Sequence, residues 1–249
     1  MIDVEHGAAA GIAEAAGRLL LQLRAQPELA EKALRDEGDR RSHDCIMSLL
    51  AEAYPDDAVL SEEGSDSTQR LDRQRVWIVD PLDGTREFGE PGRSDWAVHV
   101  ALAVDGQPVV GAVALPGLDL VLSTDDPPQV PAPRDGRTRL VVSRTRPPAV
   151  TDRVAAALDA ELLSMGSAGA KAMAVVRGEA DVYCHAGGQY EWDSAAPVAV
   201  AAAAGLHVSR LDGSALRYNR PNPWLPDLLI CRQELADAVI AAAAQAAAE

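Results

Sequence analysis

The sequence contains few aromatic residues and few cysteines, and each shortage narrows the class of protein it can encode. Aromatic side chains make up 4% of the 249 residues, so the core must be built from alanine, valine and leucine. The three cysteines, Cys45, Cys184 and Cys231, are far apart, and each lies in an apolar context. This pattern indicates buried free thiols rather than a disulfide framework or a zinc site.

Positive charge and long apolar runs are also scarce. The formal net charge of −15 argues against nucleic acid or an anionic membrane as the main partner. A phosphorylated small molecule remains compatible with it, because bound cations can invert the local sign of the charge. No run approaches the ~20 apolar residues of a membrane span, and residues 1–24 lack the pattern of a signal peptide. We therefore expect a cytoplasmic protein.

Apolar spacing predicts helices and strands that alternate around an antiparallel meander. A helix is expected over 8–24 and a second over 42–53, with Ser42 at its N-cap. Residues 76–79 form an unbroken apolar run, which is typical of a strand buried on both faces. The Asp-Gly pair at 105–106 is a strong hairpin signal. Further strands are predicted at 58–60, 97–104, 107–115, 118–123, 139–142, 181–184, 206–208 and 228–230, and further helices at 149–160, 166–177, 193–204 and 234–249.

One stretch of the chain has the composition of a boundary between two halves. Residues 125–137 read DDPPQVPAPRDGR and are rich in proline and polar side chains. We expect an N-terminal α+β half over 1–132, which carries metal, and a C-terminal α/β half over 133–249, which faces the substrate. The order of elements predicts a layered α/β or α+β protein.

Two carboxylates follow the predicted strand at 76–79 directly. Asp80 and Asp83 flank Pro81, which is expected to end the strand and stiffen the turn, and Gly84 leaves room for a ligand. Carboxylates this close repel each other unless a cation lies between them, and Mg²⁺ prefers oxygen ligands. Taken alone, the stretch is equally compatible with an ordinary turn, since Asp-Gly is common in loops.

Two further acidic sites favour the metal interpretation. Glu62 and Glu63 come at the end of the apolar run 58–60, and Asp193 opens a predicted helix. Each has an ordinary alternative, a solvated loop for the glutamates and an N-cap for the aspartate. Together the three sites predict a centre for two or more metals, which clamp the attacking water and the leaving oxygen of a phosphoester.

Competing motifs fail on spacing. A calcium-binding EF-hand loop that began at Asp80 would need a glycine at Thr85 and a glutamate at Pro91. The chain has no P-loop and no GxGxxG after a strand. Haloacid-dehalogenase-type phosphatases use Asp-x-Asp-Gly-Thr, and this chain has one residue too many, so that class stays a weak rival. The five histidines show no paired zinc spacing.

Four motifs occur in a fixed order between residues 36 and 231. They read SEE at 61–63, WIVDPLDGTREF at 77–88, GSAGAKAMAVVRGEADVY at 166–183 and EWDSAAP at 191–197. In these motifs the chain resembles the lithium-sensitive, Mg²⁺-dependent phosphatases of the inositol monophosphatase superfamily. The Arg-Glu-Phe after DGT resembles the CysQ-type 3′(2′),5′-bisphosphate nucleotidases, which act on 3′-phosphoadenosine 5′-phosphate (PAP). The resemblance implies the lithium-sensitive sugar/inositol phosphatase fold, a layered αβαβα sandwich of the α+β class with the site in a groove between its halves.

The resemblance also implies roles for particular residues. Asp39 and Thr85 would orient and deprotonate the attacking water, and the backbone N–H groups of Gly84 and Thr85 would bind the phosphate. Asp36 to Asp39 departs from the family's usual Val-Thr-x-x-Asp, and His185 stands where an arginine is common. The implied metal ligands are Glu62, Asp80, the Leu82 carbonyl, Asp83 and Asp193, with Glu63 behind them, and the implied substrate contacts are Ser167, Lys171, His185, Gln189 and Tyr190.

The activity that the resemblance implies is that of a phosphoric monoester hydrolase. It would remove the 3′-phosphate of PAP, or of its sulfated form PAPS, by metal-activated water, in support of sulfate assimilation. Two or three Mg²⁺ ions per site, inhibition by Li⁺ and a monomer or homodimer are implied, with no nucleic acid polymer or membrane as partner. Two alternatives stay open: a phosphatase for inositol 1-phosphate or fructose 1,6-bisphosphate, and a non-catalytic metal-binding relative.

Overall fold

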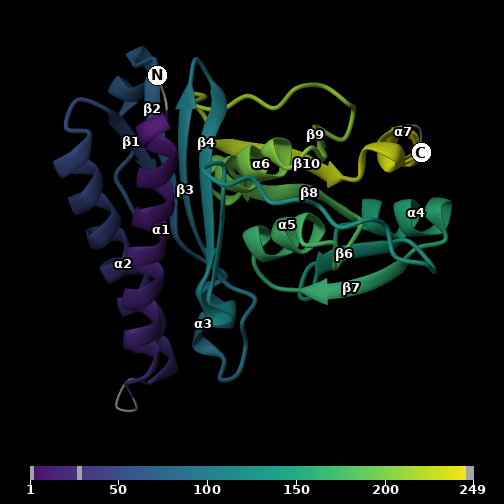
Figure 1. Cartoon of the computed structure of the whole chain (residues 1–249), viewed down its shortest axis with the longest axis horizontal. Helices are drawn as coiled ribbons and strands as arrows, with labels where there is room; N and C mark the ends of the chain where they lie inside the picture. Colours follow the sequence, from purple (N-terminus) through teal and green to yellow (C-terminus); the bar gives the residue numbers. More distant parts are fainter. Residues whose placement is uncertain (1–2, 27–29, 245–249) are drawn as a thin grey trace.

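The structure, a computed structural model of the whole chain, describes residues 3–26 and 30–244. Two five-stranded sheets stand side by side with helices on each of their faces (Figure 1). Among the described residues, no helix is long and apolar enough to cross a membrane. The helices of four residues or more are α1 (Asp3–Arg24), α2 (Glu31–Ala53), α3 (Thr85–Gly89), α4 (Ala149–Leu158), α5 (Ala168–Val176), α6 (Glu191–Ala203), α7 (Ala236–Ala244) and a 3₁₀ turn at Thr68–Asp72.

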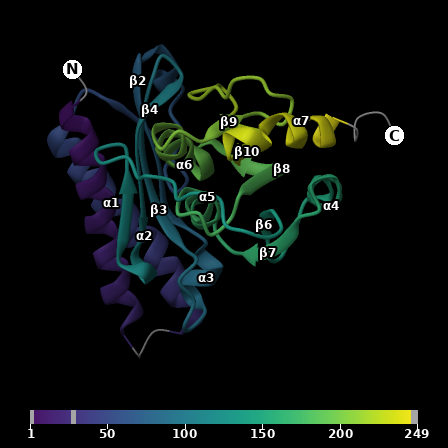
Figure 2. The ribbon, with the colours of Figure 1, turned by 45° about the vertical axis from the view of Figure 1, so that its right-hand side comes forward.

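The first sheet follows the chain order β1-β2-β3-β4-β5. Its β1–β2 pair is parallel and the other pairs are antiparallel. Helices α1 and α2 cover one face, and α5 and α6 cover the other (Figures 1 and 2). The strands are β1 (Ala58–Ser61), β2 (Arg75–Asp83), β3 (Ala97–Val104), β4 (Gln107–Leu115) and β5 (Leu120–Ser123).

The second sheet has the order β7-β6-β8-β10-β9 and mixes parallel with antiparallel pairs. Helices α4 and α7 pack on its outer face, while α5 and α6 lie between the two sheets (Figure 2). The resulting order of layers is the αβαβα sandwich expected from the sequence. The strands are β6 (Arg139–Ser143), β7 (Glu161–Met165), β8 (Val182–Tyr190), β9 (His207–Ser209) and β10 (Trp224–Cys231).

Side-chain size differs between the two faces of the first sheet. On β3, Val98, Val100 and Leu102 pack towards α1 and α2, whereas Ala97 and Ala101 lie in the core shared with α5 and α6. Small side chains let the middle helices approach the strands closely, in keeping with the chain's shortage of aromatic residues. Strands β2 and β3 therefore lie close to the first turns of α5 and α6.

The second helix begins well before the predicted start. It opens at Glu31, and Ser42 is not an N-cap but a buried interior residue whose hydroxyl donates a hydrogen bond to the Pro81 carbonyl at 2.6 Å. The buried face of this helix includes Gly38 and Ser42, which interrupt its apolar stripe. Glycine is found at position 38 because a Cβ atom there would lie 2.8 Å from the Phe88 ring. Helix α2 consequently carries Asp39 alongside the end of β2.

Several strands also differ from the prediction, among them β8 and β10, which are longer than the predicted 181–184 and 228–230. Pro81 does not end β2, which runs on to Asp83 and pairs with β3 again after a bulge. Strand β7 was missed, because it is an edge strand with a mostly exposed pattern and no apolar alternation. The hairpin β3–β4 is confirmed at its predicted bounds, with positive φ at both Asp105 and Gly106 as its tight turn requires. The two sheets are joined through residues 124–138, and the division at residue 132 stays a prediction.

We expect Gly111→Ala to destabilise the fold. A Cβ atom at Gly111 on β4 would lie 2.7 Å from both the Ala196 carbonyl oxygen and the Ala199 Cβ atom of α6. Overpacking of this kind costs about 1–3 kcal/mol of unfolding free energy. The matched control is Gly11→Ala on α1, where nothing lies within 4 Å of the added Cβ, and which should stabilise by about 0.5–1 kcal/mol. Urea denaturation measures both, and equal stability of the two variants would contradict the close packing.

Candidate active site

A bulge at the end of β2 orients two carboxylates. Asp80 pairs with His99 and Asp83 pairs with Ala97, so three steps along β2 match two along β3. A bulge bends the strand and changes the direction of its side chains. The Leu82 N–H donates to Asp80 Oδ1 at 3.1 Å, which fixes the first carboxylate against its own turn. Both carboxylates are buried in this arrangement.

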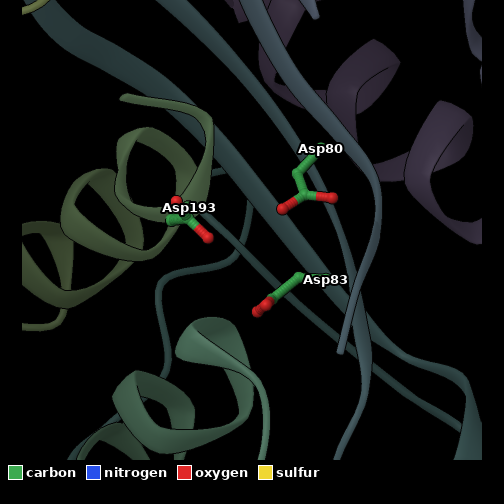
Figure 3. A group of neighbouring side chains, drawn as sticks. All are labelled: Asp80, Asp83 and Asp193. Atoms are coloured by element: carbon green, nitrogen blue, oxygen red, sulfur yellow. The ribbon is translucent and has the colours of Figure 1, made fainter. Parts of the chain in front are cut away.

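Asp193 reaches the same place from the second half of the chain. It is the third residue of α6, and its Oδ2 accepts a hydrogen bond from the Tyr190 N–H at 2.7 Å. It therefore secures the start of the helix while its side chain points towards Asp80 and Asp83 (Figure 3). One carboxylate oxygen from each of the three aspartates lies within 4.8 Å of the others. The structure thus brings together acidic residues from two of the three sites that the sequence singled out.

Asp80 and Asp193 hold protons more tightly than ordinary carboxyls do. Burial raises the pKa of Asp80 well above its usual range, and the neighbouring charges of Glu62, Asp83 and Asp193 add to that effect. Burial and then the charge of Asp83 raise the pKa of Asp193 to about 8. An all-oxygen set whose negative charges repel one another matches the preference of Mg²⁺, a hard cation, so the residues present fit that ion.

The acidic site at Glu62 and Glu63 lies next to Asp80. The Glu62 carboxyl is within hydrogen-bond reach of Asp80, and burial raises the pKa of Glu62 to about 7. Burial also raises the pKa of Asp39 to about 7, with further contributions from the charges of Glu63 and Glu62. Glu62 and Glu63 lie on the loop after β1, and the Glu62 carboxyl is its inward-facing end. The loop glutamates and the α2 aspartate thus share one electrostatic environment with the three aspartates.

The turn after β2 connects these groups to α3. The Thr85 hydroxyl lies 3.3 Å from Asp39 Oδ1 and 3.1 Å from the Leu82 carbonyl, so its single hydrogen can be donated to either. Gly84 has φ +86°, and a Cβ there would lie 3.1 Å from the Ser167 Cβ. The positive φ favours glycine, and the close approach of Ser167 leaves little room for a side chain. The turn therefore places the predicted base, its hydroxyl partner and the Leu82 carbonyl next to one another.

Two predicted substrate contacts form internal hydrogen bonds at the start of α5. The Ser167 hydroxyl donates to Asp83 Oδ2 at 2.5 Å, and the Gly169 N–H donates to the same oxygen at 2.7 Å. The buried Lys171 ammonium donates to the carbonyls of Gly166 and Ser167 at 3.1 and 2.5 Å. Ser167 thus orients the Asp83 carboxylate, and the two carbonyls fix the position of the buried Lys171 ammonium group. Their contact with substrate stays a prediction.

A cavity of about 270 Å³ opens beside Asp83 and Asp193. Its wall includes His185, whose pKa burial lowers to about 4, and Gln189, which donates to the Tyr183 hydroxyl at 2.7 Å. Tyr190 is exposed and stacks on Trp192 with 4.8 Å between ring centroids. A larger cavity of about 560 Å³ between α1 and the β4–β5 connection contains none of the predicted site residues. The lining of the smaller cavity is Asp83, Gly84, Thr85, Arg86, Glu87, Ser143, Thr145, Arg146, Gly166, Ser167, Ala168, Lys171, His185, Gln189 and Asp193.

Sequence reasoning missed two cations in this wall. Arg86 and Arg146 both line the cavity and are exposed, and neither forms an ion pair with a carboxylate of residues 3–26 or 30–244. Arg144, two residues before Arg146, shows the contrast, because its guanidinium bridges Glu87 and Glu90 at 2.6 and 2.5 Å. Arg86 could have been noticed within the Arg-Glu-Phe stretch, whereas Arg146 lies in a connection without periodic signal.

The stability of the metal-free protein should fall as pH rises from about 4 to about 8. Glu62, Asp80 and Asp193 have raised pKa values when folded, whereas unfolded carboxyls titrate near 4. The folded state therefore binds more protons in this window, and its unfolding free energy decreases with pH. Mg²⁺ replaces those protons, so it should raise Tm by several degrees at pH 8 and by less at pH 5.

Scanning calorimetry with and without Mg²⁺ checks this, with KCl at equal ionic strength as the control. The prediction would be contradicted if the Tm of the metal-free protein rose between pH 4 and pH 8 and Mg²⁺ raised Tm equally at pH 5 and pH 8.

Comparisons with known proteins show which family the chain resembles along its length. The sequence model of the inositol monophosphatase family matches residues 3–249. A Mycobacterium tuberculosis protein named 3′-phosphoadenosine 5′-phosphate phosphatase is 52% identical over 240 residues, which cover 93% of this chain and 90% of that protein. The Escherichia coli protein named 3′(2′),5′-bisphosphate nucleotidase CysQ is 36% identical over 200 residues, covering 75% of this chain and 80% of that protein.

Solved structures have the same fold. CysQ from Bacteroides thetaiotaomicron, described as a bacterial member of the inositol monophosphatase family, aligns with a TM-score of 0.78 at 27% identity over 94% of this chain and 98% of that chain. Inositol monophosphatase II from Staphylococcus aureus aligns with a TM-score of 0.80 at 22% identity over 96% of each chain, which shows the fold alone. With this fold and a match over residues 3–249, the chain belongs to the inositol monophosphatase family.

Proposed function

We propose that the protein is a Mg²⁺-dependent phosphatase that removes the 3′-phosphate of PAP. The observation that carries this proposal is the convergence of Asp80, Asp83 and Asp193 at a cavity that also holds Lys171 and Arg146. Carboxylates that hold a metal ion are typical of sites that hydrolyse phosphoesters. Two separate cationic side chains can bind the two phosphates of a bisphosphate substrate. The name of the 52% identical mycobacterial relative supports the same substrate. PAPS, the sulfated form, has the same 3′-phosphate.

Mg²⁺ would be held by the carboxylates of Asp80, Asp83, Asp193 and Glu62, together with the Leu82 carbonyl, while Glu63 adds negative charge behind them. The family is Mg²⁺-dependent, and the acidic group of this structure fits that ion. When bound, the ion neutralises phosphate charge and lowers the pKa of water. Two or three ions per site and inhibition by Li⁺ belong to this proposal.

The chain's own groups then have distinct tasks. Asp39 accepts the proton of the attacking water at a carboxylate oxygen, and the Thr85 hydroxyl, 3.3 Å away, orients that carboxylate. A pKa near 7 suits a general base at neutral pH. The N–H groups of Gly84 and Thr85 bind the phosphate that reacts. Asp83 keeps its orientation through the hydrogen bonds from Ser167 and Gly169.

The other phosphate and the nucleoside would lie further along the cavity. Arg146 and Arg86 are free to bind a phosphate because neither is engaged by a carboxylate among the described residues. Lys171 attracts the substrate through its charge, and Ser167 lies beside it. His185 and Gln189 would contact the sugar and base, and the Gln189 Oε1 atom, which has no hydrogen-bond partner in the described part of the chain, offers an acceptor.

The setting of the enzyme is part of the proposal. We place it in the cytoplasm, acting on a by-product of sulfate assimilation as a monomer or homodimer, with residues 1–132 and 133–249 as its two halves. The cytoplasmic assignment is supported by three free thiols, two of them buried. Metal ligands would come from both halves, with the cavity between them.

Phosphate release with Mg²⁺ tests the proposed substrate. We expect kcat/KM for PAP to exceed that for inositol 1-phosphate and for fructose 1,6-bisphosphate by at least about tenfold, because inositol 1-phosphate has no second phosphate for Arg146 and neither compound has a base for His185 and Gln189. Li⁺ should lower all the rates. The control is the Asp83→Asn variant, which should lose the activity. A preference for inositol 1-phosphate or fructose 1,6-bisphosphate would overturn the substrate but not the chemistry, and no release from any of the three would favour a non-catalytic relative.

Arg146→Ala should discriminate between one phosphate and two. A hydrogen bond to a charged group contributes about 1.5–3 kcal/mol, so kcat/KM for PAP should fall about 10–100-fold. For adenosine 3′-phosphate, which lacks the second phosphate, the fall should be much smaller. Arg137→Ala is the matched control, since Arg137 is exposed and pairs with Asp159 away from the cavity. Equal losses for the two substrates would exclude Arg146 from binding the second phosphate.

A further inference from the structure

A single histidine interrupts the alanine face of β3. Ala97 and Ala101 flank His99 on the side that faces α5 and α6, and the His99 side chain has no exposed surface. A buried imidazole normally satisfies both ring nitrogens with hydrogen bonds. No sequence motif drew attention to this residue, because a lone histidine within an apolar run carries no spacing signal.

One ring nitrogen is committed to α6. His99 Nδ1 lies 3.1 Å from the Trp192 carbonyl oxygen, which can only accept, so Nδ1 carries the hydrogen and donates it. Trp192 immediately precedes Asp193. The hydrogen bond therefore ties the middle of β3 to the helical turn that supplies one of the three clustered aspartates.

The other ring nitrogen faces the carboxylates. His99 Nε2 lies 3.4 Å from Asp83 Oδ2, and Nδ1 is 4.0 Å from Asp80 Oδ2. Nε2 is fully buried and has no hydrogen-bond partner within residues 3–26 and 30–244. An unpartnered buried nitrogen costs free energy, and aimed at a group of carboxylates it is well placed to face a cation.

The first turn of α5 is built around the same nitrogen. A Cβ atom at Gly169 would lie 2.0 Å from His99 Nε2, so only glycine fits against the ring. The Gly169 N–H also donates to Asp83 Oδ2 at 2.7 Å. The ring of His99 thus sets how closely α5 approaches, and the α5 backbone in turn holds Asp83.

We propose that His99 is a positioning residue of the metal centre, which fixes the first turns of α5 and α6 against β2 and directs its Nε2 lone pair at the cation site. Through α6 it sets Asp193, and through Gly169 it sets Asp83. The inference rests on the proposed Mg²⁺ site. It assigns the ring no contact with substrate and no proton transfer in the reaction.

Titration calorimetry with Mg²⁺ tests this on the full chain. Loss of a side chain that orients metal ligands typically weakens metal binding by 10–100-fold, so we expect about that increase in Kd for His99→Ala. His99→Asn keeps a donor for the Trp192 carbonyl but loses the nitrogen near Asp83, and its Kd should be intermediate. The control is Val100→Ala, on the opposite face of β3, which should lower Tm and leave Kd within about twofold. Measurements are made below the lowest Tm.

A double-mutant cycle separates positioning from general destabilisation. Gly169→Ala should weaken Mg²⁺ binding about as much as His99→Ala, because the methyl group displaces the ring. In the His99→Ala background the methyl group has room, so its further effect should be less than about threefold.

Wild-type Kd in both His99 variants, or full additivity in the cycle, would overturn the inference while leaving the proposed function intact. A wild-type chain that binds no Mg²⁺ would overturn both.

Discussion

The mutual repulsion of carboxylates in one buried place is the constraint on which the rest of this structure depends. Asp80 and Asp83 come from β2 and Asp193 comes from α6, and they converge within 4.8 Å. Burial and then the charges of neighbouring carboxylates raise the pKa values of Asp80 and Asp193, so both bind protons more tightly than ordinary carboxyls when no cation is present. A cation bound as proposed would offset the repulsion and restore full charge to the carboxylates. The acidic group is therefore destabilising by itself, and cation binding would offset that effect.

The small side chains of the core make this convergence possible. Gly111 lets α6 approach β4, and Gly169 lets α5 approach β3, so the first turns of both helices reach the end of β2. A larger residue at Gly111 would move α6 outward and separate Asp193 from Asp83, and a larger residue at Gly169 would displace the His99 ring. The scarcity of aromatic residues and the abundance of alanine, read from the composition as a property of the core, are thus also a property of the site.

Much of this arrangement could be predicted from the sequence, because it follows local rules. The β3–β4 hairpin was predicted at its true bounds from two apolar runs on either side of an Asp-Gly turn that needs positive φ. The acidic residues were found because each follows a strand or opens a helix. The start of α2 was not predicted correctly, because its buried face includes Gly38 and Ser42. These residues are small because other parts of the fold pack closely against them. The exposed edge strand β7 lacked any apolar pattern.

Other features of the site depend on contacts that no local pattern encodes. The sequence could suggest Ser167 and Lys171 as functional but not that they hydrogen bond to Asp83 and to two carbonyls. Arg146 lies in an irregular connection and becomes part of the cavity only because β6 ends there. His99 has the same character, since its importance comes entirely from the three elements that meet at its ring. Such residues can be recognised only once the fold is known.

The position of Asp193 in the chain has a consequence for synthesis on the ribosome. The strands that carry Asp80 and Asp83 form a sheet whose pairs are close in sequence, and local pairing of this kind forms early. Helix α6, which supplies the third aspartate, emerges only after β6, β7 and β8 have been made. If the three aspartates bind Mg²⁺ as proposed, the nascent chain would present an incomplete set of ligands until α6 has been made. Tight capture of metal would then wait until α6 packs between the two sheets, so metal loading would follow folding in time.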